Sequence, residues 1–427
     1  MSTRNASRRQ VVGGLFGSSM TLGPALWLGG CASGSSSAIT STQALGPKAD
    51  AAGRGGPGSA MEPAKVTLLL PQSAGIQLSL LATGLKQAAE LALFERDVPN
   101  LQLAIRDDKG TPEGASMATV ASLAEGAELI LGPLFAASVK SSASSARQAG
   151  APIIAFSNDP AVAGNGVHLL SFFSETEATR IAEHALSRGH RRYAALLPAN
   201  ALGKAVGSAF QHAIAAGGGE IAVSEVDPGD MSGMADPYRR VMDAIAGSSA
   251  GGAPIDALFL PADSDSVPRL VSLLRNQGFS SSKVRILATS GWDQPTAINE
   301  PAVRGAWLAA PDPVGWREFT ARYGKAYNSA PPRLASLVYD AVTIASAFAT
   351  QPKGQRYTAA NLMRPAGFVG VDGPFRLMPN GIVQRDLAVL EIQQQGLVAI
   401  APAGGGAPGA TPRRPGASAD AALMSRG

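Results

Sequence analysis

Residues 65–75 read KVTLLLPQSAG, a mostly apolar run that stops at a proline and a glycine-containing turn. Because polar and apolar residues do not alternate strictly, the run is typical of a strand buried on both faces of a parallel sheet. A helical pattern follows from about Leu78 to Phe94. A buried strand that leads directly into a helix predicts the start of a strand–helix–strand unit.

The same unit recurs along most of the chain. Further strands are expected at 101–105, 128–131, 152–156, 193–197, 221–224, 257–260 and 284–288. Helices are expected at 112–123, 138–149, 176–187, 202–216, 234–245, 267–277, 316–326 and 334–348. The alternation pauses near Phe172 and then restarts, which predicts an α/β protein with two doubly wound parallel-sheet lobes. In such sheets ligands bind beside the carboxyl ends of the strands.

A hairpin is expected where the folded region ends. Residues 373–377 read GPFRL, and residues 387–392 form a second apolar run. Asn380-Gly381 between them is a strong turn signal. The sequence therefore predicts that these two runs pair with each other.

The first thirty residues have the pattern of an export signal. Arginines precede an uncharged run over residues 10–30, and Cys31, the only cysteine of the chain, follows directly. The segment resembles a bacterial lipoprotein signal peptide, which implies removal of residues 1–30 and a lipid anchor on Cys31. The pair Arg8-Arg9 also resembles a twin-arginine signal, so both export routes stay open. A transmembrane anchor is disfavoured because several glycines and Pro24 interrupt the run.

The residues on either side of the folded region predict no packed core. Residues 31–63 are rich in serine, glycine, alanine and proline, and they predict a flexible tether behind the lipidated cysteine. Residues 401–427 have a similar composition and predict a disordered tail. Ala32 stands where lipoproteins of the inner membrane usually carry aspartate. The resemblance therefore implies an anchor in the bacterial envelope that faces the periplasm, in the outer rather than the inner membrane.

Charge and cysteine usage exclude several kinds of partner and stabilisation. The net charge of +4 becomes +1 when the predicted signal is removed, since three of the 36 basic residues and none of the 32 acidic ones leave with it. A nearly neutral chain gives no reason to expect a nucleic-acid partner. One cysteine cannot form a disulfide within the chain, so an exported domain of this sequence depends on its hydrophobic core.

Enzyme-like motifs occur, but none lies in the structural context that its chemistry requires. S-x-x-K at 280–283 and G-x-S-x-G at 247–251 lie in predicted loops and not at the strand-to-helix turn or helix start that a nucleophile needs. G-x-G-x-x-G at 53–58 lies in the predicted tether with no strand before it. The four histidines have no metal-ligand spacing. The sequence therefore predicts no enzyme, no cofactor and no metal site.

Three polar or aromatic features have a structural and a functional interpretation. Asp107-Asp108 are expected to cap the helix near Thr111 rather than to act as a catalytic pair. Asp340, inside an apolar helical pattern, is expected to make a structural hydrogen bond more readily than a ligand contact. Trp292 follows a predicted strand, where its ring either closes over a ligand or packs into the core.

The order of elements resembles the type I periplasmic binding protein fold, of which leucine-binding proteins are familiar members. The segments that carry the resemblance are 66–75, IRDDKG at 105–110, LGPLF at 131–135, FFSE at 172–175 and VDGPFR at 371–376. The resemblance implies two lobes joined by a three-strand hinge. It implies residues 64–173 plus about 303–352 in the first lobe, and 174–302 plus about 353–400 in the second.

Within that fold, LGPL at 131–134 and IAFSND at 154–159 look most similar to lipoproteins related to the outer-membrane activators of penicillin-binding proteins. This resemblance implies a non-enzymatic regulator of peptidoglycan synthesis, with a penicillin-binding protein as its partner. The best-known activators carry a helical-repeat domain ahead of this one, where this chain has only a predicted tether. The sequence therefore departs from the pattern of those proteins.

The alternative is a substrate-binding lipoprotein of an ABC importer for amino acids or related small solutes, with a permease and a small solute as partners. Under either interpretation the residues expected in the ligand cleft are Gln72, Ser73, Gly75, Phe135, Ala136, Ser157, Asn158, Asn200, Asp263 and Trp292. Ala136 and Ala137 offer only backbone groups where amino-acid receptors use hydroxyls, which weakens the transport interpretation because a zwitterion needs several charge-assisted hydrogen bonds.

Overall fold

The computed structural model of the chain describes residues 62–230, 235–248, 253–279, 281 and 283–403. The predicted signal peptide, Cys31 and the tether up to residue 61 lie outside the described residues, as does the tail from residue 404. Among the described residues, no helix combines the length and apolar character that a membrane crossing requires.

The first lobe is built on a five-stranded parallel sheet with the order β2-β1-β3-β4-β5. Its strands are β1 (Ala64–Leu70), β2 (Leu101–Asp107), β3 (Leu129–Leu131), β4 (Ile153–Ala155) and β5 (Val167–Leu169). Its helices are α1 (Ile76–Arg96), α2 (Pro112–Ala124) and α3 (Ala136–Gln148), with the short 3₁₀ turn η1 (Pro160–Val162) before β5. Only Lys65 of β1 is exposed, so the strand predicted from KVTLLL is a central, two-sided one.

The second lobe contains a seven-stranded sheet with the order β15-β14-β10-β9-β8-β6-β7. The parallel strands are β6 (Arg192–Pro198), β7 (Glu220–Asp227), β8 (Ala257–Phe259), β9 (Arg285–Thr289) and β10 (Trp307–Ala310). The antiparallel strands are β14 (Ala388–Gln393) and β15 (Gly396–Ala401). The helical segments are α4 (Ser174–Ser187), α5 (Ala201–Ala216), α6 (Ala235–Ser248), α7 (Val267–Asn276), η2 (Ser290–Trp292), α8 (Pro295–Ile298) and η3 (Pro301–Val303).

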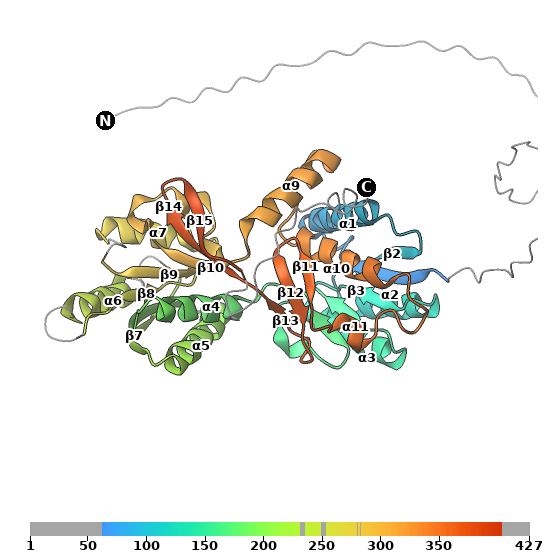
Figure 1. The fold of residues 1–427 in the computed structure, drawn as a ribbon, viewed down its shortest axis with the longest axis horizontal. Helices are drawn as coiled ribbons and strands as arrows, with labels where there is room; N and C mark the ends of the chain where they lie inside the picture. The colour runs from blue at the N-terminus through green and yellow to red at the C-terminus, as the bar shows by residue number, and fades with distance from the viewer. Residues whose placement is uncertain (1–61, 231–234, 249–252, 280, 282, 404–427) are drawn as a thin grey trace, which may run out of the picture. The chain divides into compact units, whose positions relative to one another are not determined.

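The remaining elements return to the first lobe. They are α9 (Pro313–Tyr327), α10 (Ala335–Phe348), α11 (Ala359–Leu362) and a small antiparallel sheet of β11 (Phe368–Gly370), β12 (Gly373–Leu377) and β13 (Val383–Arg385). Side chains of all three strands of this sheet belong to the first lobe's core. In Figure 1 the orange β11–β13 accordingly lie beside the blue and cyan elements, whereas the red β14 and β15 lie with β10.

The predicted hairpin is wrong in its pairing. Asn380-Gly381 does form the turn, with Gly381 at φ 81°, but the returning strand is β13, which pairs with β12. Residues 388–393 instead form β14, which pairs with β10 and β15. The turn was therefore predicted at the correct position. Two strands, β13 and β14, follow this turn in the chain, and the prediction paired β12 with the later of the two.

The expected lobe boundaries are corrected at two places. Residues 307–310 were expected in the first lobe, but as β10 they pair with β9 in the second sheet. Residues 353–385 were expected in the second lobe, but Tyr357, Leu362 and the β11–β13 strands contribute to the first lobe's core. The chain therefore passes between the lobes three times, at 170–173, 311–312 and 386–387, which matches the expected three-strand hinge.

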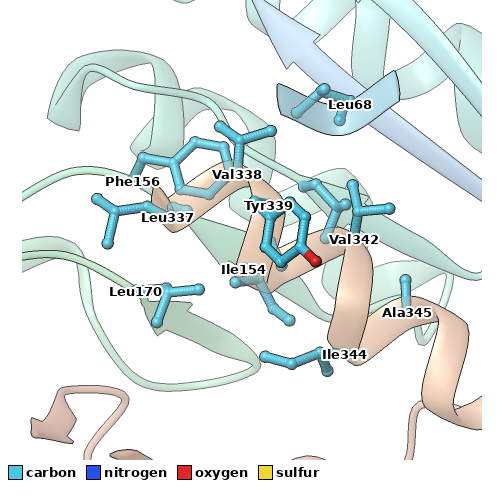
Figure 2. Packing of buried hydrophobic residues seen from close by; sticks show 14 of the residues in the cluster. Leu68, Ile154, Phe156, Leu170, Leu337, Val338, Tyr339, Val342, Ile344 and Ala345 are labelled. Atoms are coloured by element: carbon cyan, nitrogen blue, oxygen red, sulfur yellow. The ribbon is translucent and has the colours of Figure 1, made fainter. Parts of the chain in front are cut away.

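Helix α10 fills the centre of the first lobe. Of its 14 residues 12 are buried, which explains why its sequence is apolar on every side. Figure 2 shows Leu337, Val338 and Val342 of this helix among residues within β1 and β4 and residues that directly follow β4 and β5. The residues labelled there are Leu68, Ile154, Phe156, Leu170, Leu337, Val338, Tyr339, Val342, Ile344 and Ala345. Burying each large aliphatic side chain of this cluster contributes about 2 kcal/mol to folding.

Candidate functional site

A cavity of about 680 Å³ opens where the second lobe meets the hinge and the start of α9. Its walls come from the carboxyl ends of β9 and β10, the first turn of α4, the turn between β14 and β15, and Arg333, two residues before α10. The lining residues are Phe172, Glu177, Ser264, Ser290, Gly291, Asp293, Ile298, Ala310, Pro311, Asp312, Pro313, Trp316, Arg317, Arg333, Asp372, Gln395, Gly396 and Leu397. Its volume and its mixture of apolar and polar walls suit a small-molecule ligand.

Arg333 is held in place on three sides. Its guanidinium carbon lies 4.4 Å from the centre of the Phe172 ring and 4.5 Å from that of a Trp316 ring, so it stacks against two aromatic residues. Its two terminal nitrogens donate to the carboxylate of Asp372, at 2.5 and 3.1 Å. Asp372 has no exposed surface and also accepts a hydrogen bond of 2.6 Å from Ser336 Oγ. This arrangement fixes both the charge and the plane of the guanidinium at the cavity wall.

Among the acids that line the cavity, Glu177 has the largest shift in pKa. It is buried in the first turn of α4, and its carboxylate accepts hydrogen bonds from Ser290 N (2.9 Å) and Ser290 Oγ (2.7 Å). Burial raises its pKa to about 7, against the lowering effect of the Ser290 hydrogen bonds and of the Arg333 charge. Near neutral pH this carboxyl can therefore be present with or without its proton.

Two further charged side chains, Asp340 and Arg385, are buried near the hinge. Asp340 accepts a hydrogen bond of 2.9 Å from Val371 N, and burial raises the pKa of its carboxyl to about 7. The prediction of a structural hydrogen bond for Asp340 is confirmed. Arg385 is buried nearby between the rings of Phe172 (5.3 Å) and Phe375 (5.1 Å), and burial lowers its pKa. Phe172 therefore contacts both Arg385 and Arg333.

The predicted cleft residues after β1 form an organised loop outside this cavity. Asp107 accepts hydrogen bonds from Gln72 N (2.9 Å), Ser73 N (3.3 Å) and Ser73 Oγ (2.5 Å). Burial would raise the pKa of Asp107, but hydrogen bonds from Ser73, Lys109 and Gln72 together hold it below its ordinary value. Gly75, at φ 94°, begins α1. Gln72 and Ser73, which were expected in the ligand cleft, therefore have their backbone N–H groups bonded to Asp107.

The expected role of Asp107-Asp108 as helix caps is wrong. Thr111 itself caps α2, because its hydroxyl accepts from Gly114 N at 3.0 Å. Asp107 holds the β1–α1 loop instead, and Asp108 accepts from Gly110 N at 2.8 Å. Sequence spacing could not reveal this, since β1 and β2 become neighbours only in the folded sheet.

The other predicted residues also lie at the carboxyl ends of strands but do not line the cavity of 680 Å³. Phe135 and Ala136 begin α3, Ser157 is buried and accepts from Asp159 N at 3.2 Å, and the neighbouring Asn158 is exposed. Asn200 caps α5 by accepting from Gly203 N at 3.0 Å, and Asp263 accepts from Ser266 N at 2.9 Å. The side chains of the last two therefore stabilise the starts of helices.

Trp292 packs into the core. It has no exposed surface, and its indole N–H donates to Leu260 O at 2.9 Å. Of the two interpretations of this residue, the geometry favours packing. Its neighbour Gly291 does line the cavity, and a Cβ there would lie 2.0 Å from Ala262 O, so only glycine fits.

Arg333, Trp316 and Glu177 line the cavity but were not predicted from the sequence. Glu177 falls in a predicted helix and Trp316 at the start of another, so each looked like an ordinary helical residue. Tryptophan is scarce in this chain, so a predicted amphipathic helix that begins with a tryptophan is unusual. This was the signal available for Trp316. Phe172 was recognised only as part of a crossover between the lobes.

The comparisons with known proteins agree with this architecture. A family model described as periplasmic binding protein matches residues 63–397. The chain belongs to the periplasmic binding protein family. No curated protein matches the chain. The match covers both lobes and the hinge, so the α/β fold with two mostly parallel sheets is that of this family.

Several solved structures share the fold of this periplasmic binding protein. One is a protein of Rhodospirillum rubrum assigned to a branched-chain amino acid ABC transporter; it is 20% identical, with a TM-score of 0.69, over 79% of this chain and 100% of its own. An ABC transporter substrate-binding protein from Sphaerobacter thermophilus is 21% identical, with a TM-score of 0.61, over 80% of this chain and 97% of its own. An ABC transporter substrate-binding protein from Desulfitobacterium hafniense, in complex with Leu, is 18% identical, with a TM-score of 0.57, over 79% of this chain and 100% of its own.

Proposed function

We propose that this periplasmic binding protein is the substrate-binding component of an ABC importer for amino acids or related small solutes. The observation that carries the proposal is the cavity at the hinge, where Arg333 is clamped between Phe172 and Trp316 and shares the lining with the buried Glu177. The similarity to substrate-binding proteins of ABC transporters supports it. This was the alternative of the sequence analysis, and it now has more support than the activator hypothesis.

The lining gives two parts of such a solute a surface to contact. The rings of Phe172 and Trp316, with Ile298 and Leu397, offer apolar area. Glu177, Ser290 and the exposed Asp293 offer acceptors, which suit an ammonium or amide group.

A ligand in this cavity touches segments that move if the lobes rotate about the hinge. Phe172, Pro311 and Asp312 lie in the crossings between the lobes, and Glu177 and Ser290 belong to the second lobe. A solute that binds better when these segments are close together shifts the population toward that arrangement. We therefore assign the protein a binding role without catalysis, in which the bound form is presented to a permease.

The predicted location fits this role. A lipid on Cys31 and a tether to residue 63 would hold the domain at a membrane on the periplasmic side, within reach of a permease. The choice between outer and inner membrane stays a prediction, and contact with an inner-membrane permease favours the inner one. The hypothesis of a penicillin-binding protein activator that regulates peptidoglycan synthesis also stays a prediction, and the comparisons lend it no support.

A thermal-shift and calorimetric screen tests the proposal. The panel contains amino acids, small amides, muropeptides and a purified transpeptidase domain of a peptidoglycan synthase. A ligand at about a hundredfold over its Kd adds roughly 2.7 kcal/mol to the stability of the folded protein. We expect a stereospecific shift with an amino acid or related solute, and a Kd about tenfold weaker in Trp316→Ala.

Phe94→Ala is the matched control, because this aromatic side chain is 83% exposed and does not line the hinge cavity. Its Kd should equal that of the unmodified protein. A protein that ignores every small solute but binds the transpeptidase domain would contradict the importer role and restore the activator hypothesis. A solute whose Kd is the same in Trp316→Ala would place the site elsewhere.

A further inference from the structure

A second cavity, of about 390 Å³, lies in the first lobe at the amino ends of β4 and β5. These strand starts are at the edge of the sheet opposite the carboxyl-end loops. The end of α3 forms one wall, and α11 with the residues just before it forms the other, two helices that lie near each other in Figure 1. It shares no residue with the hinge cavity.

Most of this cavity is apolar and open. Ala143, Ala146, Ile153 and Leu362 are among its lining residues. Gly150 also lines it, and a Cβ built there meets no atom within 4 Å, so the space beside the backbone is unfilled. The volume accommodates a ring or a short aliphatic chain.

The polar groups of the cavity are all neutral or positive. Among the described residues, no aspartate or glutamate lines it. Arg147, in the last turn of α3, is exposed at the cavity, and no hydrogen bond or ion pair involves its side chain within the part of the chain that the structure describes. A free guanidinium beside an apolar space favours a ligand with one negative charge, since Arg pairs with a carboxylate through two parallel hydrogen bonds.

His168 adds a buried polar group. This residue lines the cavity, is only 6% exposed, and carries an Nδ1 atom with no hydrogen-bond partner among the described residues. Burial lowers the pKa of this imidazole, so at neutral pH it is uncharged and offers one N–H donor. A buried polar atom without a partner is destabilising, so this imidazole is a weak point of the cavity wall.

We propose that the first lobe binds a small monocarboxylate with an apolar body in this second cavity, with Arg147 holding the carboxylate at the rim and the apolar body lying among the alanines and Leu362. This site is additional to the solute site of the proposed function and does not depend on it. A cationic ligand fits less well, because the described lining contains no acid and Arg147 would repel it.

The test compares cyclohexanecarboxylate with its uncharged isostere cyclohexanecarboxamide, each titrated into the full-length protein in a mild detergent. Binding is measured by calorimetry and by saturation-transfer NMR on the ligand. We expect the acid to bind with a Kd of about 1 mM or tighter, and the amide at least tenfold more weakly.

Substitutions at the cavity test whether the acid binds there. Arg147→Gln should weaken binding of the acid about tenfold, and Ala359→Trp, from an exposed position of α11 that lines the cavity, should abolish it by filling the space. Arg188→Gln, at an exposed arginine that lines neither this cavity nor the hinge cavity, is the matched control and should change nothing. Trp316→Ala, in the hinge cavity, should also leave this Kd unchanged.

The proposal is overturned if acid and amide bind equally, or if neither Arg147→Gln nor Ala359→Trp changes the Kd of the acid. Absence of binding up to about 10 mM acid likewise overturns it. Loss of the acid's binding in Trp316→Ala alone would assign the ligand to the hinge cavity and not to the first lobe. Failure of the solute screen leaves these expectations unchanged, because the two cavities have no residue in common.

Discussion

Glu177 and Ser290, which are 113 residues apart in the sequence, are joined by two hydrogen bonds between the start of α4 and the end of β9. The carboxylate accepts from both the backbone N–H and the hydroxyl of the same serine. A buried acid held by one residue of a neighbouring element fixes the position of α4 against the second sheet. It also places a titrating group in the wall of the hinge cavity.

The first prediction concerns pH and stability. The pKa of Glu177 is raised from 4.5 to about 7, so the folded protein holds this proton more tightly than the unfolded chain. Its contribution to stability is complete below about pH 4.5 and is lost as the pH rises through about 7, a change of about 3 kcal/mol. Asp340, with a pKa also raised to about 7, acts in the same direction.

Glu177→Gln isolates one of these two groups. We expect the free energy of unfolding of this variant, measured in urea, to fall by about 3 kcal/mol less between about pH 4.5 and 7 than that of the unmodified protein, because the titration of Glu177 is removed while those of Asp340, His168 and His184 remain. Glu183→Gln, at an exposed position of the same helix, should keep the original dependence. An unchanged dependence in Glu177→Gln would show that this carboxyl titrates at its ordinary value.

The second prediction separates two tryptophans. Trp292 is fully buried, so Trp292→Phe should destabilise the protein by about 2–4 kcal/mol, through lost packing and a lost hydrogen bond to Leu260 O, while the Kd for the solute stays within about twofold. Trp316 lines the cavity, so Trp316→Ala should weaken binding about tenfold with a smaller loss of stability. Chemical denaturation and calorimetry on both variants measure the two effects. A ligand affinity that falls only in Trp292→Phe would reverse the assignment.

The third prediction concerns the loop after β1. Asp107→Ala removes the acceptor of three hydrogen bonds from Gln72 and Ser73, two of them backbone N–H groups. We expect a loss of about 1–2 kcal/mol in the free energy of unfolding and faster amide exchange at residues 72 and 73. Asp97→Ala, at the end of α1, is the control for removing an acid, and it should leave exchange in this loop unchanged. Equal exchange rates in both variants would mean that Asp107 does not order the loop.

The fold could be predicted from sequence because its strands carry a local signal. Runs such as Leu68-Leu69-Leu70 are buried in the sheet, and apolar periodicity reports burial directly. The errors came at the end of the chain, where β13 is only three residues long and left no run to recognise. The predicted partner of β12 was therefore the longer apolar run that forms β14.

The site was harder to predict because its parts come from distant segments. Arg333, Phe172 and Trp316 belong to three regions that meet only after the chain has crossed between the lobes. Helix caps such as Asn200 and loop acids such as Asp107 have their polar groups used internally, and sequence alone does not distinguish them from ligand-binding groups. Trp292 was misleading for a related reason, since a strand end can direct an aromatic ring into the core.

The last prediction tests whether the geometry of Arg333 matters beyond its charge. Lysine keeps the positive charge but cannot form the paired hydrogen bonds to Asp372, nor stack as a flat group between Phe172 and Trp316. Arg333→Lys should therefore weaken solute binding about tenfold, with Trp316 losing the contact that orders its ring. Tryptophan fluorescence should report this change, whereas Arg188→Lys on the exposed end of α4 should alter neither affinity nor fluorescence. Full affinity in Arg333→Lys would mean that the cavity uses this residue only as a point charge, and the aromatic clamp would then be a feature of the hinge and not of the ligand site.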